Sequence, residues 1–188
     1  MSTVALRRLA SEDGETIAYL QRGGKSPGVL WLGGFRSDMS GTKAQALDAW
    51  AAARERGFLR FDYFGHGRSS GDFRDGTIGR WRNDALCVLD RLSEGPQFLV
   101  GSSMGAWIAL LLAQARPERI AGLLLLAPAP DFTEALIWQA LPEDVRRTLL
   151  ESGEWQRPSA YEPAYPITQN LIEEGRRHLV LDAPIALG

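Results

Sequence analysis

The amino-acid sequence predicts an α/β protein whose sheet is mainly parallel and is covered by helices on both faces. Short segments of strand character recur at residues 28–32, 58–61, 97–100 and 120–127. The first of them, GVLWL, is a continuous apolar run, as is typical of a strand buried on both faces. Stretches of helical length separate these segments, and alternation at this spacing is typical of βαβ units.

The N-terminal part predicts an antiparallel edge and then the first helix. Residues 4–9 and 16–20 indicate two short strands, and the turn-rich residues 11–14 between them indicate a hairpin. Apolar side chains follow at helical spacing through residues 42–56, and Gly57 stands where a helix C-cap belongs. We therefore expect a helix that ends at this glycine.

Two more helices are predicted at residues 77–92 and 106–115. After residue 128 the alternation of strands and helices stops. Residues 131–178 contain amphipathic helical pieces without an obvious strand. The pieces cover residues 133–140, 142–150 and 167–177. Such an insertion usually lies above the strand carboxyl ends, so we expect one domain over residues 1–188 with a helical cap at about 131–178.

The composition favours small-molecule chemistry over binding to polymers. The chain has 188 residues, 45% of them hydrophobic, with 21 basic and 23 acidic side chains and a net charge of −2. This balance gives no electrostatic footprint for nucleic acid or an anionic membrane. The longest apolar stretch, residues 120–127, is too short for a membrane span. The first residues resemble neither a signal nor a transit peptide, so a cytoplasmic protein is expected.

Residue types also argue against a cofactor. The single cysteine, Cys87, excludes an internal disulfide framework and a cysteine-based metal cluster, and its apolar helical surroundings indicate simple packing. Histidines, cysteines and carboxylates form no cluster in the sequence, and no Walker-type phosphate loop occurs. We therefore expect neither a metal nor a nucleotide.

One motif carries the chemistry. Residues 101–105, Gly-Ser-Ser-Met-Gly, fit G-x-S-x-G and stand between an apolar strand and an apolar helix. A sharp strand-to-helix bend holds the central hydroxyl out of the sheet, and glycines on both sides allow close approach. The spacing selects Ser103 over Ser102 as a nucleophile. The alternative is a tight turn that contains serine by chance.

Acyl transfer also needs N–H donors for the developing oxyanion. In such proteins one donor follows the nucleophile and another lies in the loop after the third strand. These positions point to the backbone N–H groups of Met104 and Phe35. The alternative is that Gly33 and Gly34, before Phe35, only end a strand.

Three blocks, residues 31–39, 62–71 and 101–105, make the chain resemble the α/β-hydrolase superfamily. Within it, the chain is similar to the serine hydrolases related to palmitoyl-protein thioesterase and acyl-glucuronide esterase. The resemblance implies an eight-stranded, mostly parallel sheet whose second strand runs antiparallel. It also implies the order serine, acid, histidine, with the acid after the seventh strand and the histidine after the eighth.

Four residues compete for the missing acid and base. His66 precedes Ser103 in the chain and lies in a G-H-G loop that is structural in similar hydrolases, so a structural role is favoured. His178 ends a predicted helix, where capping and dipole effects explain it. Asp131 is expected to be a helix N-cap, and Asp182 stands in the short C-terminal tail.

Neither acid nor base can therefore be assigned within the chain. We expect that both follow Gly188 in a longer protein, that the chain alone is nearly inactive, and that an uncovered strand at residues 123–126 favours association. The first functional hypothesis is a serine esterase or thioesterase that acts on a small-molecule ester or thioester through an acyl-serine. The alternative is a catalytically inactive hydrolase fold used for binding or partner contact.

Overall fold

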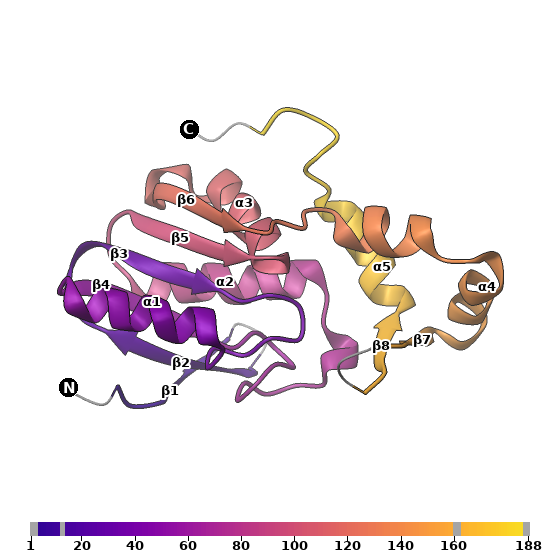
Figure 1. The fold of residues 1–188 in the computed structure, drawn as a ribbon, viewed down its shortest axis with the longest axis horizontal. Helices are drawn as coiled ribbons and strands as arrows, with labels where there is room; N and C mark the ends of the chain where they lie inside the picture. The colour runs from indigo at the N-terminus through magenta and orange to yellow at the C-terminus, as the bar shows by residue number, and fades with distance from the viewer. Residues whose placement is uncertain (1–3, 12–13, 160–162, 186–188) are drawn as a thin grey trace.

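The computed structural model describes residues 4–11, 14–159 and 163–185, and these residues form a six-stranded sheet in the order β1-β2-β4-β3-β5-β6 (Figure 1). The strands are β1 (Arg7–Ala10), β2 (Thr16–Arg22), β3 (Lys25–Leu32), β4 (Arg56–Phe61), β5 (Gln97–Ser102) and β6 (Ile120–Leu126). Strand β2 is antiparallel to both of its neighbours, and β3 to β6 pair in parallel. The predicted α/β class and N-terminal hairpin are thus confirmed.

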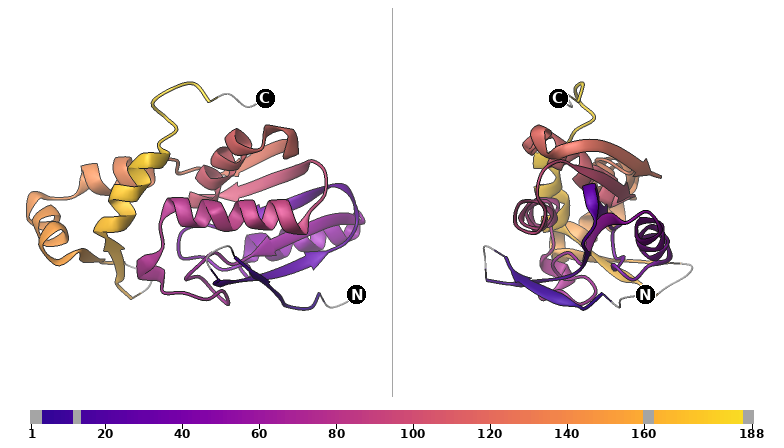
Figure 2. Two further views of the ribbon diagram at one scale, coloured as in Figure 1. Left: turned by 180° about the vertical axis from the view of Figure 1, so that it is seen from behind. Right: turned by 90° about the vertical axis from the view of Figure 1, so that its left-hand side faces the viewer.

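Helices cover both faces of this sheet (Figures 1 and 2). Helix α1 (Thr42–Ala53) lies on one face, and α2 (Ile78–Leu92) and α3 (Met104–Ala115) lie on the other. Every residue of α3 from Met104 to Ala113 is buried, because this helix is apolar on all sides and packs against β5 on one side and α2 on the other. The larger core lies on the α2 and α3 side.

The first helix ends earlier than the sequence predicts, so the assignment of Gly57 as its C-cap is wrong. Helix α1 ends at Ala53, and Glu55 takes a positive φ of 55° that turns the chain directly into β4. Gly57 is therefore a strand residue. A β-carbon added to it would lie 3.6 Å from the Gly28 Cα, an ordinary contact with the neighbouring strand β3.

The segment after β6 contains a hairpin as well as helices, which corrects the expectation of an uninterrupted helical cap. Its elements are η3 (Thr133–Ile137), η4 (Trp138–Ala140), α4 (Glu143–Ser152), β7 (Glu154–Arg157), β8 (Tyr165–Thr168), α5 (Gln169–Gly175) and η5 (Arg176–His178). Gly153 ends α4 in a left-handed conformation, and β7 then pairs antiparallel with β8. Figure 1 shows this segment beyond the carboxyl ends of the parallel strands, where the cap was predicted.

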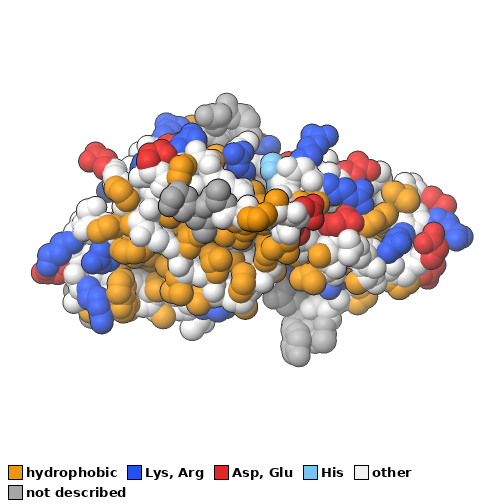
Figure 3. Space-filling model, turned by 90° about the horizontal axis from the view of Figure 1, so that it is seen from above, with side chains coloured by type: hydrophobic (Ala, Val, Ile, Leu, Met, Phe, Trp, Pro, Cys, Tyr) orange, Lys and Arg blue, Asp and Glu red, His pale blue; other side chains and the backbone are white. Residues whose placement is uncertain are grey.

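An apolar groove lies on the α1 side of the sheet, next to β6. Its volume is about 640 Å³, and Trp50, Phe98 and Leu124 on its lining are 39%, 38% and 52% exposed. Figure 3 views the molecule from the β6 side and shows hydrophobic side chains gathered along this part of the surface. Association through this surface stays a prediction.

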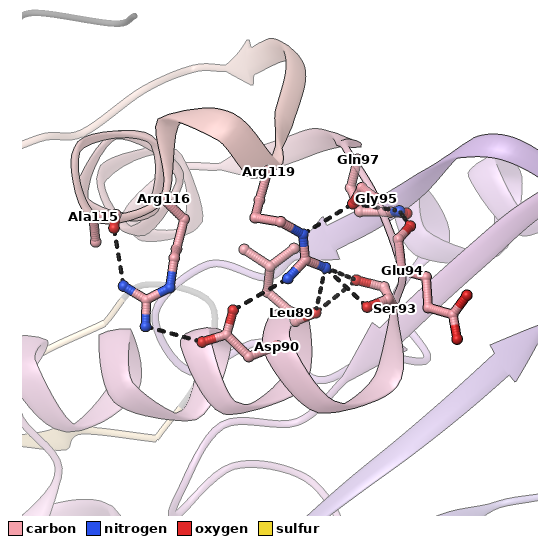
Figure 4. A network of polar contacts seen from close by, with 9 residues as sticks. All are labelled: Leu89, Asp90, Ser93, Glu94, Gly95, Gln97, Ala115, Arg116 and Arg119. Atoms are coloured by element: carbon pink, nitrogen blue, oxygen red, sulfur yellow. Dashed lines mark hydrogen bonds and ion pairs between the residues drawn. The ribbon is translucent and has the colours of Figure 1, made fainter.

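An arginine network ties the end of α2 to the connection between α3 and β6, which includes η2 (Pro117–Arg119) (Figure 4). Arg119 donates to the backbone oxygens of Leu89, Ser93 and Gly95 at 2.8–3.0 Å, and its side chain is 19% exposed. The last carbonyls of a helix have no partner within the helix, so this guanidinium supplies donors that α2 itself lacks.

We expect Arg119→Ala to lower the free energy of unfolding by about 2 kcal/mol, because it leaves several carbonyl oxygens without a charged donor. Arg116 provides the matched control. Its side chain is 41% exposed, and its bonds go to the half-exposed Asp90 and the adjacent Ala115 oxygen, so Arg116→Ala should cost less than about 1 kcal/mol. Urea denaturation of both variants measures the difference, and equal losses would contradict the assignment.

Candidate active site

Ser103 occupies the bend between β5 and α3. Its φ and ψ are 54° and −118°, a combination that non-glycine residues rarely adopt and that stores strain. Hydrogen bonds hold the bend in place: the Ser103 N–H donates to the Leu126 oxygen at 3.0 Å, and its own oxygen accepts from Ala106 and Ala129. The backbone thus has the conformation that the G-x-S-x-G pattern predicts, while the role of the hydroxyl stays a prediction.

The two motif glycines permit this bend. A β-carbon on Gly105 would lie 2.0 Å from the Leu32 oxygen, and one on Gly101 would lie 2.4 Å from the Gly105 oxygen. Both contacts involve backbone, which cannot move aside like a side chain. Helix α3 can therefore start beside the ends of β3 and β5 only because these positions lack side chains.

A β-turn lies directly beside the serine. A β-carbon on Gly34 would stand 3.5 Å from the Ser103 Cβ, and the turn is closed by the Ser37 N–H donating to the Gly34 oxygen at 3.0 Å. Phe35 is the second residue of this turn. Its N–H has no hydrogen-bond acceptor among residues 4–11, 14–159 and 163–185.

The second predicted donor, Met104, is the first residue of α3. A helix leaves its first N–H groups without a carbonyl partner, and its dipole places partial positive charge there. The structure therefore brings all three predicted site residues, Ser103, Phe35 and Met104, to one place at the carboxyl end of the sheet.

The Phe35 side chain anchors the turn in an aromatic cluster. Its ring lies 5.1–6.1 Å, centroid to centroid, from four other rings. These rings belong to Phe73, Trp81, Phe132 and Tyr165. Because Tyr165 lies in β8 and Trp81 in α2, the cluster joins the cap to the main domain directly beside the serine. No sequence pattern identified Phe73, Trp81 or Phe132 as neighbours of the site.

The cap aromatics belong to the same core. Trp138, Leu141, Trp155 and Tyr165 pack against the larger hydrophobic cluster, in agreement with the core-packing interpretation of these residues. Tyr161, the remaining candidate for an acyl pocket, lies outside the described residues. Cys87 is half-buried and packs against the same cluster.

Both ring nitrogens of His66 are engaged. The ring is 4% exposed, Nε2 accepts the Arg36 N–H at 3.1 Å, and Nδ1 lies 3.0 Å from the Phe64 oxygen. Since Nε2 accepts, Nδ1 carries the proton and donates to Phe64. Burial lowers the pKa of His66, which favours this neutral form. The geometry agrees with a structural role for this histidine.

His178 is bound to a carboxylate instead of capping a helix, which corrects its sequence interpretation. Its Nε2 lies 2.6 Å from Glu174 Oε1, and Glu174 Oε2 accepts the Gly79 N–H at 3.0 Å. Burial raises the pKa of Glu174, but the bonds from His178 and Gly79 outweigh it, so the net pKa lies below its usual value. The His178 oxygen also accepts the Trp107 indole N–H.

The Asp131 side chain does not cap a helix as the sequence predicts, although its backbone oxygen accepts the Glu134 and Ala135 N–H groups. The residue is 4% exposed, and its carboxylate accepts the N–H groups of Val180 and Leu181, each at 2.9 Å. The backbone reverses sharply at Asp131, where φ is 56°, and the side chain therefore faces the returning C-terminal tail instead of η3. Asp182 is exposed in that tail.

The described part of the chain shows no group of three or more histidine, cysteine, aspartate or glutamate side chains that could hold a metal ion. In the same residues, no helix is both long and apolar enough to cross a membrane.

Comparison with known proteins identifies the family. A sequence profile described as serine aminopeptidase, S33, matches residues 8–169. The mitochondrial palmitoyl-protein thioesterase ABHD10 of Pongo abelii is 39% identical over 183 residues, which are 96% of this chain and 60% of that protein. The Homo sapiens protein of the same name is 38% identical with the same coverage. The chain thus spans about 60% of the length of these relatives.

Solved structures agree with this. A putative hydrolase from Agrobacterium vitis S4 has a TM-score of 0.94 and 42% identity, and the match covers 100% of this chain and 77% of that one. Mouse alpha/beta hydrolase domain-containing protein 10 has a TM-score of 0.88 and 38% identity, covering 97% and 74%.

The names of the relatives overturn one prediction. The ABHD10 proteins from five mammals are all named as mitochondrial, which contradicts the expectation of a cytoplasmic protein. That expectation depended on the residue types of a short N-terminal stretch, which are a weak indicator of the compartment. The resemblance to thioesterase-related hydrolases, in contrast, is confirmed by the profile, the relatives and the fold, and the chain belongs to the α/β-hydrolase family described as serine aminopeptidase, S33.

Proposed function

We propose that this protein is a serine hydrolase that cleaves carboxylic ester or thioester bonds through an acyl-serine intermediate. The observation that carries the proposal is the strained Ser103, held at a strand-to-helix bend beside the Phe35 turn. The name palmitoyl-protein thioesterase, which the mammalian relatives bear, supports a thioester as substrate. A small-molecule ester is the other substrate class that the same chemistry accepts.

In the proposed reaction, Ser103 Oγ forms a bond to the acyl carbon and gives up its proton to a base. The carbonyl oxygen becomes an oxyanion, which accepts hydrogen bonds from the Phe35 and Met104 N–H groups. The intermediate then collapses, the bond to the alcohol or thiol breaks, and the leaving group takes a proton. Water hydrolyses the acyl-serine and restores Ser103.

The oxyanion site would act because its donors are fixed before the reaction starts. Phe35 is held by its aromatic cluster and Met104 by α3, so neither amide has to reorganise as charge develops. Each donor is expected to contribute about 3 kcal/mol of transition-state stabilisation, by comparison with other hydrolases.

One observation favours the alternative of an inactive binding protein. Neither histidine is placed to serve as the base for Ser103: the Nε2 lone pair of His66 accepts the Arg36 N–H, and His178 lines a pocket near the C-terminal end of α3, away from Ser103. In that alternative the cap would bind a ligand or partner, and the protein would catalyse no reaction. Covalent labelling separates the two functions, because a binding protein has no reason to present a reactive serine.

The test is the reaction of the protein with millimolar alkyl fluorophosphonate over several hours, followed by intact mass spectrometry and peptide mapping. We expect one adduct, located on Ser103, because a preorganised oxyanion site leaves about 10³–10⁴-fold of rate enhancement even without a base. Ser103→Ala should abolish the adduct. Ser102→Ala is the matched control and should retain it, since Ser102 is a buried residue of β5. An adduct that persists in Ser103→Ala, or never forms, would overturn the proposal.

A further inference from the structure

The turn that carries Phe35 has an arginine at a position that favours glycine. In the turn Gly34–Ser37, Arg36 is the third residue and has a φ of 60°. A positive φ at this position is the feature of type II turns, which favour glycine there, because a side chain in the left-handed region meets its own backbone. Two contacts from outside the turn hold Arg36: a hydrogen bond to His66, and the Tyr165 ring, whose centroid lies 4.3 Å from the Arg36 guanidinium carbon.

The Arg36 N–H is held by His66. This bond, 3.1 Å from the Arg36 nitrogen to Nε2, joins positions 30 residues apart in the sequence. The ring cannot turn away, because Nδ1 is bonded to the Phe64 oxygen and the rings of Tyr63, Phe73 and Trp81 surround it at 5.2–5.8 Å. His66 is thus a rigid acceptor aimed at the strained residue of the turn.

We propose that His66 is a positioning residue for acyl transfer: by accepting the Arg36 N–H it fixes the turn and thereby directs the preceding Phe35 N–H toward the oxyanion. The inference rests on the proposed function of Ser103 and adds a residue that touches neither the substrate nor the serine. It also assigns a role to the G-H-G loop, because the histidine of that loop reaches the oxyanion turn. His66 acts only while Nε2 is unprotonated.

The surroundings of His66 keep it neutral. Burial lowers its pKa most, the hydrogen bond to the Phe64 oxygen opposes this, and the nearby positive charge of Arg36 lowers the pKa further, so that the net pKa is below its usual value. Tyr63 from its own loop packs against the ring. Asp72 and Arg74 at η1 (Phe73–Asp75) and Tyr165 of β8 share a cavity of about 320 Å³ with it. Loss of the acceptor is therefore expected below the usual histidine range of about pH 6.5, in acid and not at neutral pH.

The hydrogen bond is tested by amide hydrogen exchange of ¹⁵N-labelled protein, which needs no enzyme activity. In the wild type the Arg36 amide should exchange slowly at pH 7, and its protection should fall in the same pH step in which the His66 ring takes up a proton. His66→Ala should expose the Arg36 amide, whereas His66→Gln should keep part of the protection, because the glutamine carbonyl can reach the position of Nε2. An unprotected Arg36 amide in the wild type would overturn the proposal.

The positioning role is tested by the rate of Ser103 phosphonylation. His66→Ala should slow it about 10²–10³-fold, the loss measured elsewhere when one oxyanion donor is removed. Arg36→Gly should make His66 dispensable, because glycine adopts a φ of 60° without help. In the Arg36→Gly background, His66→Ala should therefore slow labelling less than about 10-fold. If His66 were the base, Arg36→Gly could not rescue it.

His178→Gln is the matched control, since His178 is also bound through Nε2 but contacts Glu174 instead of the turn. This variant should leave both the Arg36 protection and the labelling rate unchanged. Should His66→Ala fail to fold, His66→Gln takes its place with and without Arg36→Gly; its partial loss of protection predicts a smaller slowing of labelling, which Arg36→Gly should remove. The Arg36 amide of the wild type could be protected although Ser103 never reacts with the fluorophosphonate. This result would overturn both the proposed function and the positioning role of His66, and would confirm only the hydrogen bond. A rate that falls equally with and without Arg36→Gly would overturn the positioning role alone.

Discussion

Replacing Gly105 with alanine is expected to prevent stable folding, with a loss of about 4 kcal/mol or more in the free energy of unfolding. The new β-carbon would lie 2.0 Å from the Leu32 oxygen and 2.5 Å from the Gly33 oxygen. Leu32 ends β3 and Gly33 directly follows it, and β3 lies inside the sheet between β4 and β5 and cannot retreat. Relief of the clash would require α3, a helix buried along ten consecutive residues, to leave the sheet.

Gly33→Ala is the matched control, because it adds the same methyl group a few ångströms away. The nearest atom to its β-carbon would be the Trp31 indole nitrogen at 3.8 Å, an ordinary contact. We expect a change of less than about 1 kcal/mol. Urea denaturation followed by circular dichroism compares the two variants with the wild type. A Gly105→Ala protein that unfolds at the wild-type urea concentration would show that α3 does not start where the structure has it.

The sequence predicts the sheet and its helices well because their signals are local. Each signal lies within a few residues of the feature that it predicts. The apolar run at residues 28–32 predicts β3, the apolar spacing predicts α1, and the glycines around Ser103 predict the bend. The hairpin of β7 and β8 has no such signal. Each strand has four residues, too few to establish a period, and their pairing of Trp155 with Ile167 is fixed by the tertiary fold.

The site shows the same division. The positions of Ser103, Phe35 and Met104 follow from two short motifs, which are read without knowledge of the fold. Asp131 was misassigned because its partners, Val180 and Leu181, are 49 and 50 residues further along the chain. A carboxylate before a helix reads as an N-cap unless one knows that a distant segment returns to it. The bond between His66 and Arg36 could not be predicted for the same reason.

The chain is expected to hydrolyse an activated aryl ester about a millionfold more slowly than a serine hydrolase whose serine is paired with a histidine base. Ser103 needs a group that takes its proton, and in a comparable enzyme the loss of the histidine alone costs about this factor. His66 cannot act as the base without giving up the Arg36 N–H. In its neutral form Nδ1 carries the proton, and the one basic lone pair, on Nε2, accepts the Arg36 N–H. His178 is bound to Glu174 through Nε2 and lines a pocket with Gln114 and Ala115, at the opposite end of α3 from Ser103.

The rate of ester hydrolysis is measured with p-nitrophenyl acetate in the steady state, and the Ser103→Ala variant gives the background rate. The expected result is a rate close to that background, together with slow stoichiometric phosphonylation of Ser103, because the proposed oxyanion donors need no base to act.

Rapid turnover that requires Ser103 would contradict the prediction and would identify a histidine as the base. His178→Gln would then abolish turnover if His178 were that base. If His66 were the base, His66→Gln would abolish it even in the Arg36→Gly background, where the turn no longer needs an acceptor. A serine that reacts once but does not turn over would separate two parts of the catalytic apparatus: stabilisation of the oxyanion, which we propose for the turn and α3, and proton transfer, which neither histidine is placed to perform.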